Sequence, residues 1–244
     1  MNQSEVLQTM QERYDQVKAR VEAAASRSRR DPNDVLILAV SKLQSPEKIR
    51  AAYHAGIRAF GESYVEEALP KLETLSDLEN VSWEMVGHVQ SRKAKRTANT
   101  FSRLHSLATL KLANLLNRHR DPALGALEVL IQVNVSGEDS KQGLPATNAQ
   151  EWEDVFAFTH ALKACPNLRL SGLMCMPPLF DDPEHNRPYF KMTRELRDFL
   201  NARDPELKLK ELSMGTSYDF DIAVEEGATI VRLGSILLGD SIRG

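Results

Sequence analysis

The stretch VLILAVSKLQSP, residues 35–46, decides the fold and also poses the question of function. Its run of aliphatic and β-branched residues predicts a strand over 35–41, and no turn residue separates that strand from Lys42. Ser45 followed by a proline is typical of a helix N-terminus, so a helix is expected over 45–56. A strand that passes at once into a helix is the building unit of a parallel α/β fold.

The rest of the chain repeats this alternation. Strands are expected at residues 35–41, 57–62, 82–87, 102–107, 127–135, 168–175, 209–214 and 229–234. Helical patterns lie between them, at residues 45–56, 63–75, 89–99, 108–120, 148–164, 183–203 and 218–228. Eight such units in a chain of 244 residues favour a closed barrel over an open sheet. The sequence therefore predicts an α/β fold, a single (β/α)8 TIM barrel, as one domain over residues 1–244.

The first thirty residues stand apart from this alternation. Apolar side chains recur there every three or four residues, as at Val17, Val21 and Ala24, which indicates an amphipathic helix. Because this pattern, over residues 1–30, precedes the first expected strand, we expect the helix to pack against the outside of the barrel.

Composition and charge narrow the classes of partner. The net charge of −3 and the pI near 6.1 argue against nucleic acid or an anionic membrane surface. The polar N-terminus lacks the apolar core of a signal peptide, and no apolar run is long enough to span a bilayer, so a cytoplasmic protein is expected. Cys165 and Cys175 belong to no metal-binding motif; we interpret them as core residues and expect no metal site.

The last two expected strands end in loops that suit a phosphate group. In a TIM barrel the loops after strands seven and eight commonly bind phosphate, because free backbone N–H groups there attract anions. Either loop alone is better explained by ordinary turns and helix caps, but together they favour a phosphate site. The candidate residues are Ser213, Met214, Gly215, Thr216 and Ser217 in the first loop, and Arg232, Gly234 and Ser235 in the second.

Strand parity places Lys42 on the same face as Leu36, Leu38 and Val40. If that face is the barrel interior, the amine stands partly desolvated at the mouth, above a floor of aliphatic side chains. An amine in such a place can attack a carbonyl group. An imine-forming lysine beside a phosphate site suggests pyridoxal 5′-phosphate, which carries both an aldehyde and a phosphate. A lysine at a strand end is otherwise more often a surface group.

Arg232 is the second charged candidate at the mouth. By the same alternation it shares a face with Ile230 and Gly234, so it can point toward the pyridine nitrogen or the phosphate of the cofactor. A guanidinium at the ring nitrogen disfavours protonation of that nitrogen and weakens the ring as an electron sink. The alternative is an arginine whose charged end extends out of the barrel.

Seven segments between about residues 35 and 239 carry a resemblance to a known family: AVSK, AFGESYVEEA, GHVQSRKAK, HSLATLKLA, VNVSGEDSKQG, GLMCMPP and LSMGTSYDFDIAVEEGATIVRLGSILLG. In this order they resemble the pyridoxal phosphate homeostasis protein family, whose barrel is similar to the N-terminal domain of alanine racemase. The resemblance implies that Lys42 forms an aldimine with pyridoxal 5′-phosphate. It also implies that the SMGTS and RLGS loops hold the phosphate, and that Arg232 lies against the cofactor.

Three positions depart from the family pattern. Ser63 stands where asparagine is usual, and its short hydroxyl cannot reach as far as an amide, which leaves a cofactor contact from that position open. Glu84 stands where histidine is common, and Thr216 where methionine is usual. None of these changes removes the lysine or the glycines of the predicted site.

Four weaker features have an ordinary structural interpretation. His88 and His105 end expected strands, and each is either a residue of the mouth or a structural histidine with satisfied hydrogen bonds. Lys141 follows the fifth expected strand and is interpreted as an exposed loop lysine rather than a second amine of the pocket. The basic run at residues 91–96 is interpreted as a solvated helix face.

The leading hypothesis is a monomeric protein that holds pyridoxal phosphate reversibly for vitamin B6 homeostasis, with recipient apo-enzymes as partners and no catalytic residue. The resemblance supplies this function, whereas the residues supply only the binding site. An alternative is a pyridoxal-phosphate-dependent amino-acid racemase. Alanine racemase relies on a second domain with a tyrosine base, and only ILLGDSIRG follows the last expected strand here. A third hypothesis is a lysine-imine aldolase acting on phosphosugars.

Overall fold

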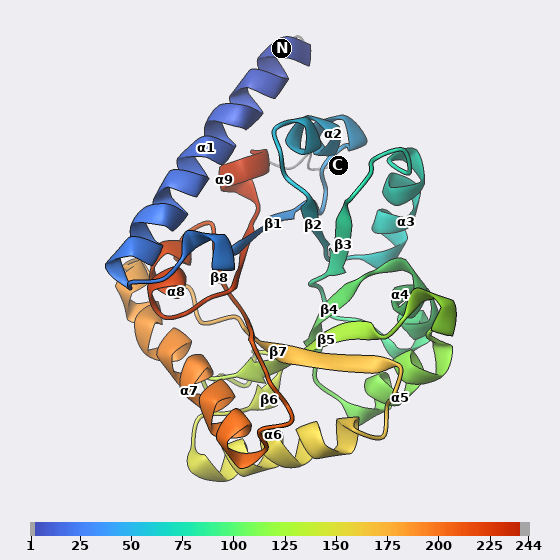
Figure 1. Ribbon diagram of the computed structural model, residues 1–244, viewed down its shortest axis with the longest axis vertical. Coiled ribbons are helices and arrows are strands. Elements are labelled where there is room, and N and C mark those ends of the chain that lie inside the picture. Colours follow the sequence, from blue (N-terminus) through green and yellow to red (C-terminus); the bar gives the residue numbers. More distant parts are fainter. Residues whose placement is uncertain (1–2, 240–244) are drawn as a thin grey trace.

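Eight parallel strands close into a barrel in the computed structural model, which describes residues 3–239 (Figure 1). The strands follow the order β4-β3-β2-β1-β9-β8-β7-β5, and β5 pairs with β4 to complete the ring. They are β1 (Leu36–Val40), β2 (Ala59–Glu62), β3 (Ser82–Met85), β4 (Arg103–Leu107), β5 (Leu127–Asn134), β7 (Leu168–Cys175), β8 (Glu211–Thr216) and β9 (Ile230–Leu233). The predicted TIM barrel is confirmed. A short strand that was not expected, β6 (Leu144–Pro145), pairs with the end of β5.

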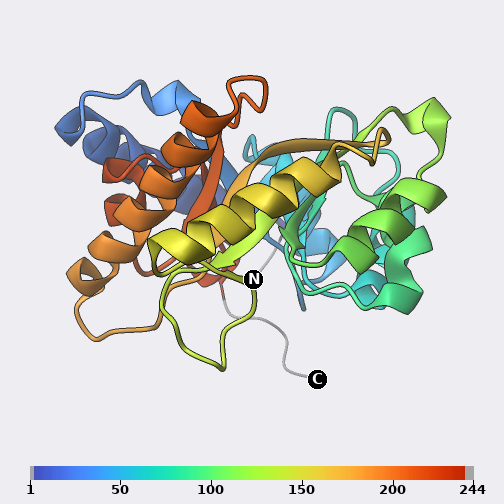
Figure 2. The same cartoon turned by 90° about the horizontal axis from the view of Figure 1, so that it is seen from below.

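Helices form the outer ring of the barrel (Figures 1 and 2). They are α1 (Gln3–Arg27), α2 (Pro46–His54), α3 (Val65–Thr74), α4 (Ala94–Thr100), α5 (Leu110–His119), α6 (Ala149–Leu162), α7 (Arg187–Arg203), α8 (Phe220–Glu225) and α9 (Ser235–Leu238). The helix α2 begins at the expected cap, where the hydroxyl of Ser45 accepts from the N–H of Lys48, and α6 begins at Asn148, whose side chain accepts from the N–H of Glu151. The expected helix at 183–203 starts with a 3-10 turn, η4 (Pro183–Asn186), before α7.

The helix α1 packs outside the barrel, as the sequence predicts. Val17, Val21 and Ala24 are buried, and the helix lies against α2, α8 and α9 (Figure 1). An ion pair of 2.5 Å joins Arg27 to Glu225 on α8. The expected bounds of this helix and of the domain include residues 1–2 and 240–244, which lie outside the described residues.

The strands carry two different layers of side chains. Ala39 and Phe60 are paired in register and face the helices, where they belong to the main hydrophobic core. Leu38, Ala59 and Ile230 form a separate cluster on the opposite face of the strands, in the barrel interior. The predicted parity of the first strand is therefore confirmed, because Leu38 is on the inward face.

The interior is more polar than the sequence predicts. Besides its few aliphatic residues it holds the buried side chains of Glu84, His105, Gln132, Ser213 and Arg232. The expectation of an aliphatic floor beneath Lys42 was only partly right. The reason is that strands β3, β4, β8 and β9 each direct at least one polar side chain inward, where these groups bind one another.

Other expectations concern the cysteines, metals and membranes. Cys165 and Cys175 are free thiols, both buried and both part of the core, as predicted. Among residues 3–239, no three side chains of the His, Cys, Asp and Glu types are grouped so that they could hold a metal ion. In the same part of the chain, no helix has the length and apolar character needed to cross a bilayer.

Candidate functional site

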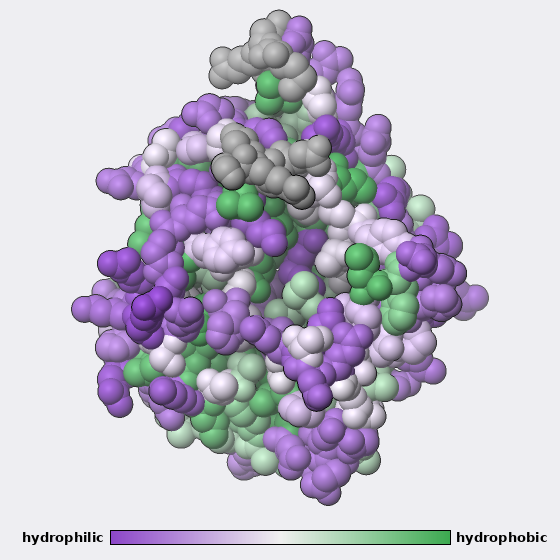
Figure 3. Space-filling model, turned by 180° about the vertical axis from the view of Figure 1, so that it is seen from behind, coloured by the Kyte–Doolittle hydropathy of each residue, from purple (hydrophilic) through white to green (hydrophobic). Residues whose placement is uncertain are grey.

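A cavity of about 430 Å³ opens at the C-terminal ends of the strands. Figure 3 shows this face of the molecule, which is hollowed near its centre. The loop after β5 extends beyond the barrel on the same side (Figure 2). Six of the residues predicted from the sequence line the cavity: Lys42, Thr216, Ser217, Arg232, Gly234 and Ser235.

Lys42 lies in a tight turn that follows β1. The carbonyl of Ser41 accepts a hydrogen bond of 3.1 Å from the N–H of Gln44, and Leu43 between them has a positive φ of 58°. The side chain of Lys42 lines the cavity but is exposed, rather than partly desolvated as expected. The physical reason is that the mouth is open above this turn, so solvent reaches the amine.

Arg232 is held rigidly at the bottom of the cavity. One guanidinium nitrogen donates to the hydroxyl of Ser213 at 2.8 Å, and the other donates to the carbonyl of Cys175 at 2.9 Å. The residue is only 6% exposed, and burial lowers the pKa of its guanidinium from the ordinary value. A guanidinium has no acceptor and stays charged, so Arg232 presents a fixed positive group to the cavity.

A chain of hydrogen bonds continues from Ser213 through the barrel interior. His105 binds Ser213 Oγ through Nδ1 at 2.8 Å, and binds Glu84 Oε2 through Nε2 at 2.7 Å. Burial would raise the pKa of Glu84, but the hydrogen bond from His105 and the charge of Arg103 outweigh it and hold that pKa below its ordinary value. The carboxylate of Glu84 is therefore ionised and can only accept.

This ionisation state assigns every proton in the chain. Since Glu84 only accepts, Nε2 of His105 carries a proton, and burial lowers the pKa of His105 so that the ring is neutral. Its Nδ1 then accepts from the hydroxyl of Ser213, which in turn accepts from Arg232. All donors point in one direction, from Arg232 at the mouth toward Glu84, so the hydrogen bonds reinforce one another.

Three of the predicted residues do not line the cavity. Ser213 and Met214 are fully buried, and Gly215 lies beneath the loop. The reason is that β8 continues to Thr216, two residues beyond its expected end, with an irregular register against β9 between Ser213 and Thr216. Gly215 has a φ of +89°, and a Cβ atom there would lie 2.6 Å from Cβ of Ala223, so the close packing of α8 requires glycine.

The two predicted phosphate loops meet at the cavity. The N–H of Gly234 donates to the hydroxyl of Ser217 at 3.1 Å, which joins the loops directly. The carboxylate of Asp219 fixes the first loop by accepting from the N–H and the hydroxyl of Thr216, at 2.7 and 2.9 Å. Within residues 3–239, the N–H groups of Ser217 and Ser235 have no hydrogen-bond acceptor, so they remain available to an anion.

The weaker features of the sequence have mostly structural roles. His105 is the buried histidine described above and does not line the cavity, whereas His88 and Ser63 do. Lys141 does not line it either; its amine donates to the carbonyl of Pro177 at 3.4 Å.

The basic run belongs to α4 and the turn before it. Within residues 91–96, Lys93 pairs with Glu66, while Arg92, Lys95 and Arg96 are exposed, which agrees with a solvated helix face.

Some residues of the cavity were not found from the sequence. Tyr218, Gln132, Gln142 and Met176 also line it, and they come from four separate loops or strand ends. Their positions in the last part of β5 and after β5, β7 and β8 were the only available signal, because polar and apolar residues at strand ends have no pattern of their own.

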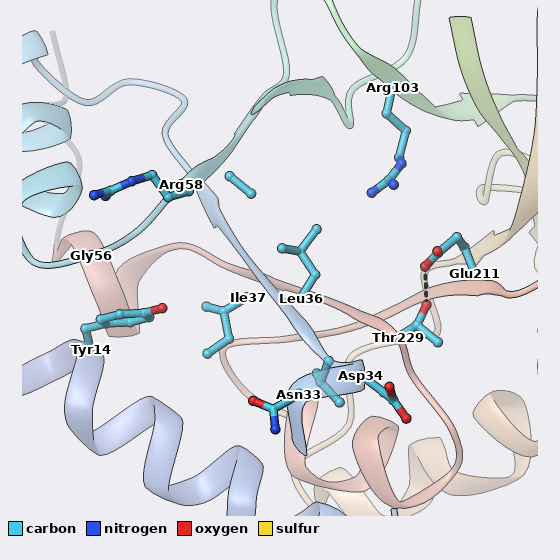
Figure 4. A pocket seen from close by; sticks show the side chains of 12 residues that line it. Tyr14, Asn33, Asp34, Leu36, Ile37, Gly56, Arg58, Arg103, Glu211 and Thr229 are labelled. Carbon is cyan, nitrogen blue, oxygen red and sulfur yellow. Dashed lines mark hydrogen bonds between the residues drawn. The ribbon is translucent and has the colours of Figure 1, made fainter. Parts of the chain in front are cut away.

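A second pocket of about 400 Å³ lies at the opposite end of the barrel (Figure 4). Tyr14, Arg58, Arg103 and Glu211 surround it, and the hydroxyl of Thr229 donates to Glu211 at 2.6 Å. This end carries the N-terminal ends of the strands, where side chains contribute to stability rather than to chemistry in barrels of this type. We therefore regard the mouth that contains Lys42 as the candidate site.

Comparison with known proteins identifies the family of the chain. A family model described as the alanine racemase N-terminal domain matches residues 13–242. A protein of Aquifex aeolicus is 40% identical, over 94% of this chain and 97% of its own, and one of Pseudomonas aeruginosa is 42% identical, over 96% of both chains. Both are named pyridoxal phosphate homeostasis protein. The chain belongs to this family.

Solved structures place the pyridoxal phosphate homeostasis protein family within a wider fold. PipY of Synechococcus elongatus has two solved structures, one without pyridoxal phosphate (PLP) and one with PLP bound. The first is 34% identical to this chain and the second 33%. The TM-scores are 0.79 and 0.78, over 90% of this chain and 99% or 100% of the PipY chains. Alanine racemase of Corynebacterium glutamicum is 17% identical with a TM-score of 0.66, over 95% of this chain and 61% of its own, and shares the fold alone.

Proposed function

We propose that this protein binds pyridoxal 5′-phosphate reversibly at the barrel mouth and takes part in vitamin B6 homeostasis. The observation that carries the proposal is the meeting of Lys42, Arg232 and the two predicted phosphate loops around one cavity. The family supports it, because the relatives are named for pyridoxal phosphate homeostasis and one solved member has PLP bound.

The cavity suits a ligand of this size and chemistry. Its volume of about 430 Å³ is within the range of about 300 to 1,000 Å³ that small-molecule sites occupy. Pyridoxal 5′-phosphate supplies an aldehyde that condenses with a primary amine, and a phosphate that prefers backbone N–H groups and hydroxyls. Lys42 offers an accessible amine in the same cavity. The residues present therefore fit the cofactor.

Five of the lining residues have a proposed task. Lys42 attaches the aldehyde carbon, and the N–H groups and hydroxyls of Ser217 and Ser235 hold the phosphate, with Gly234 allowing its close approach. Arg232 faces the ring. Ser213 acts indirectly, because it binds Arg232 and is fully buried.

In this proposal the protein does not turn over amino acids. Arg232 can only donate, so at the ring nitrogen it would keep that atom unprotonated and weaken the electron sink that most catalysis on amino acids requires. The relatives are named homeostasis proteins rather than enzymes. Recipient apo-enzymes as partners, the monomeric state, the single domain over 1–244 and the cytoplasmic location stay predictions.

Attachment can be tested directly. Pyridoxal 5′-phosphate is added to the purified protein, borohydride is then added, and the peptides are mapped. We expect the pyridoxyl label on Lys42, and we expect the absorbance of the label to be absent in Lys42→Met. A label on Lys141 alone would reject the assignment, and no label on any lysine would reject the proposed function.

Turnover and transfer distinguish a carrier from a racemase. Protein loaded with pyridoxal 5′-phosphate is incubated with L- and D-amino acids in deuterated water, and exchange of the α-proton is followed by NMR. In parallel, transfer to an apo-enzyme is measured. We expect transfer without sustained exchange. Turnover of any amino acid at ordinary enzymatic rates, about 1 per second or faster, and dependent on Lys42, would favour the racemase.

A further inference from the structure

A cluster of buried charges lies directly beneath the turn that carries Lys42. The amine of Lys71 on α3 lies 2.7 Å from a carboxylate oxygen of Glu62 and 2.7 Å from one of Glu67. Glu62, at the end of β2, is fully buried, and Lys71 is nearly so. Charges are seldom buried in this way without a specific arrangement of partners, since removal from water opposes it.

The cluster binds the backbone on both sides of Lys42. On one side, Lys71 Nζ donates to the carbonyl of Ser41 at 2.9 Å, and the hydroxyl of Ser41 donates to Glu62 at 2.7 Å. On the other side, the N–H of Leu43 donates to Glu67 at 2.6 Å. The residues before and after Lys42 are thus fixed by one cluster, whereas the side chain of Lys42 stays exposed at the mouth.

Leu43 needs such an anchor. Its φ of 58° lies in the left-handed region, which is unfavourable for a leucine and natural for a glycine. Its side chain is 47% exposed, so packing offers little to hold it there. The hydrogen bond to Glu67 is the contact that fixes its backbone in the described structure.

The charge of Lys71 keeps the cluster together. Burial raises the pKa of Glu62, and the charge and hydrogen bond of Lys71 oppose that rise. Among residues 3–239, the second oxygen of Glu62 has no hydrogen-bond partner, so its carboxyl group depends on Lys71 and Ser41 alone. Without Lys71, two carboxylates would share a largely apolar space beneath the turn.

We propose that Lys71, with Glu67 and Glu62, is a clamp that holds the turn at residues 41–44 and thereby aims the amine of Lys42 into the mouth. These are positioning residues, because none of them lines the cavity. The task of the clamp rests on the proposed function, since Lys42 is taken as the group that attaches an aldehyde. The geometry of the turn, however, can be measured without any ligand.

The first experiment uses Lys71→Met in the full chain, without ligand, and measures hydrogen exchange at the amide of Leu43 by NMR. We expect exchange at least about tenfold faster than in the unchanged protein, because Glu67, which accepts from this N–H, loses the amine that holds it in place. The second measurement is the rate at which borohydride-trapped pyridoxyl label builds up on Lys42. We expect it to fall about tenfold, with the label still on Lys42.

A rescue variant separates positioning from general damage. Leu43→Gly adopts a positive φ without penalty, so Lys71→Met with Leu43→Gly should recover much of the lost labelling rate, about two- to fivefold. In the unchanged background, Leu43→Gly should alter the rate less than twofold. The matched control is Lys191→Met. Like Lys71, Lys191 forms an ion pair with a glutamate four residues later or earlier on the same helix, here Glu195, but Lys191 is exposed.

The possible results distinguish a failure of the clamp from a failure of the proposed function. Unchanged exchange at Leu43 in Lys71→Met overturns the clamp, even if the unchanged protein is labelled normally. Failure to label Lys42 in the unchanged protein counts against the proposed function, while faster exchange at Leu43 would still support the clamp. If Lys71→Met does not fold, Glu67→Leu tests the same cluster by changing its more exposed member. In that variant, exchange at the Leu43 amide as slow as in the unchanged protein would overturn the proposal.

Discussion

Arg232 donates a hydrogen bond of 2.8 Å to the hydroxyl of Ser213, and both side chains lie inside the barrel, almost fully removed from solvent. The pair joins the last two strands of the barrel at the bottom of the mouth. It also connects the charged group of the cavity to His105 and Glu84, which lie deeper. The position of Arg232 is therefore decided by residues that do not line the cavity.

We expect Ser213→Ala to destabilise the protein by about 1 to 3 kcal/mol, because it leaves a donor on Arg232 and an acceptor on His105 buried without partners. Urea unfolding of the ligand-free protein measures this loss. The control is Ser91→Ala, an exposed serine whose hydroxyl has no hydrogen bond among the described residues, and it should stay within about 0.5 kcal/mol. Equal stability of the two variants would contradict the network.

The neutral state of His105 predicts a dependence of stability on pH. Burial lowers its pKa in the folded protein, so below pH 6.5, the ordinary value, the unfolded chain binds a proton that the folded protein does not. The stabilisation is therefore present above pH 6.5 and is lost as pH falls toward the lowered pKa. We expect His105→Gln to reduce the slope of unfolding free energy against pH in this window by up to about 1.4 kcal/mol per pH unit.

Urea unfolding between pH 5 and 7.5 tests this expectation, with His160→Gln as the control because His160 is exposed. An identical slope in His105→Gln and the unchanged protein would refute it. The 15N chemical shifts of the ring offer an independent check, since they should show a neutral imidazole protonated at Nε2 at pH 7.

Gly234→Val should weaken the binding of pyridoxal 5′-phosphate about ten- to a hundredfold, which corresponds to one charge-assisted hydrogen bond of about 1.5 to 3 kcal/mol. A Cβ atom at Gly234 would meet nothing of the protein closer than 3.9 Å, so we expect the valine side chain to obstruct the phosphate rather than the fold. Titration followed by absorbance measures the affinity. Pyridoxal, which lacks the phosphate, is the control ligand and should bind almost as before; equal losses for both would argue against the phosphate loops.

Gly215→Ala should cost more stability than Gly125→Ala, by about 1 to 3 kcal/mol. Both glycines have a positive φ, of 89° and 67°, so both variants introduce backbone strain. Only at Gly215 does the new Cβ also collide, with the side chain of Ala223 at 2.6 Å, whereas nothing lies within 4 Å at Gly125. Thermal and urea unfolding measure the difference, and similar losses in both variants would show that α8 moves away without cost.

Local patterns in the sequence were enough to predict the barrel and the place of Lys42. Alternation along β1 puts Leu38 inside the barrel, because side-chain direction is a property of the strand itself. The same alternation, continued to Lys42, puts its amine at the mouth. The glycine and hydroxyl residues after β9 were found because they follow the last strand of a barrel, where free backbone N–H groups attract anions. Each of these features depends on residues that are neighbours in the chain.

Ser213 and Lys71 show what the sequence could not predict. The SMGTS pattern suggested that Ser213 belonged to the phosphate loop, yet β8 continues to Thr216 and Ser213 is fully buried inside the barrel. Lys71 has the spacing of an ordinary surface pair with Glu67, yet it is buried beneath the Lys42 turn. Nothing within either segment distinguishes these outcomes.

Local patterns were thus enough to predict the eight strands of the barrel, though not β6, together with the inward face of β1 and the loops that surround the mouth. Only the tertiary structure decided which buried polar groups bind one another, as His105 does with Glu84 and Ser213, and Lys71 with the turn before α2. The physical reason is that side-chain direction follows from local backbone geometry, whereas the partner of a buried charge depends on strand register and barrel closure, which bring together residues far apart in the chain.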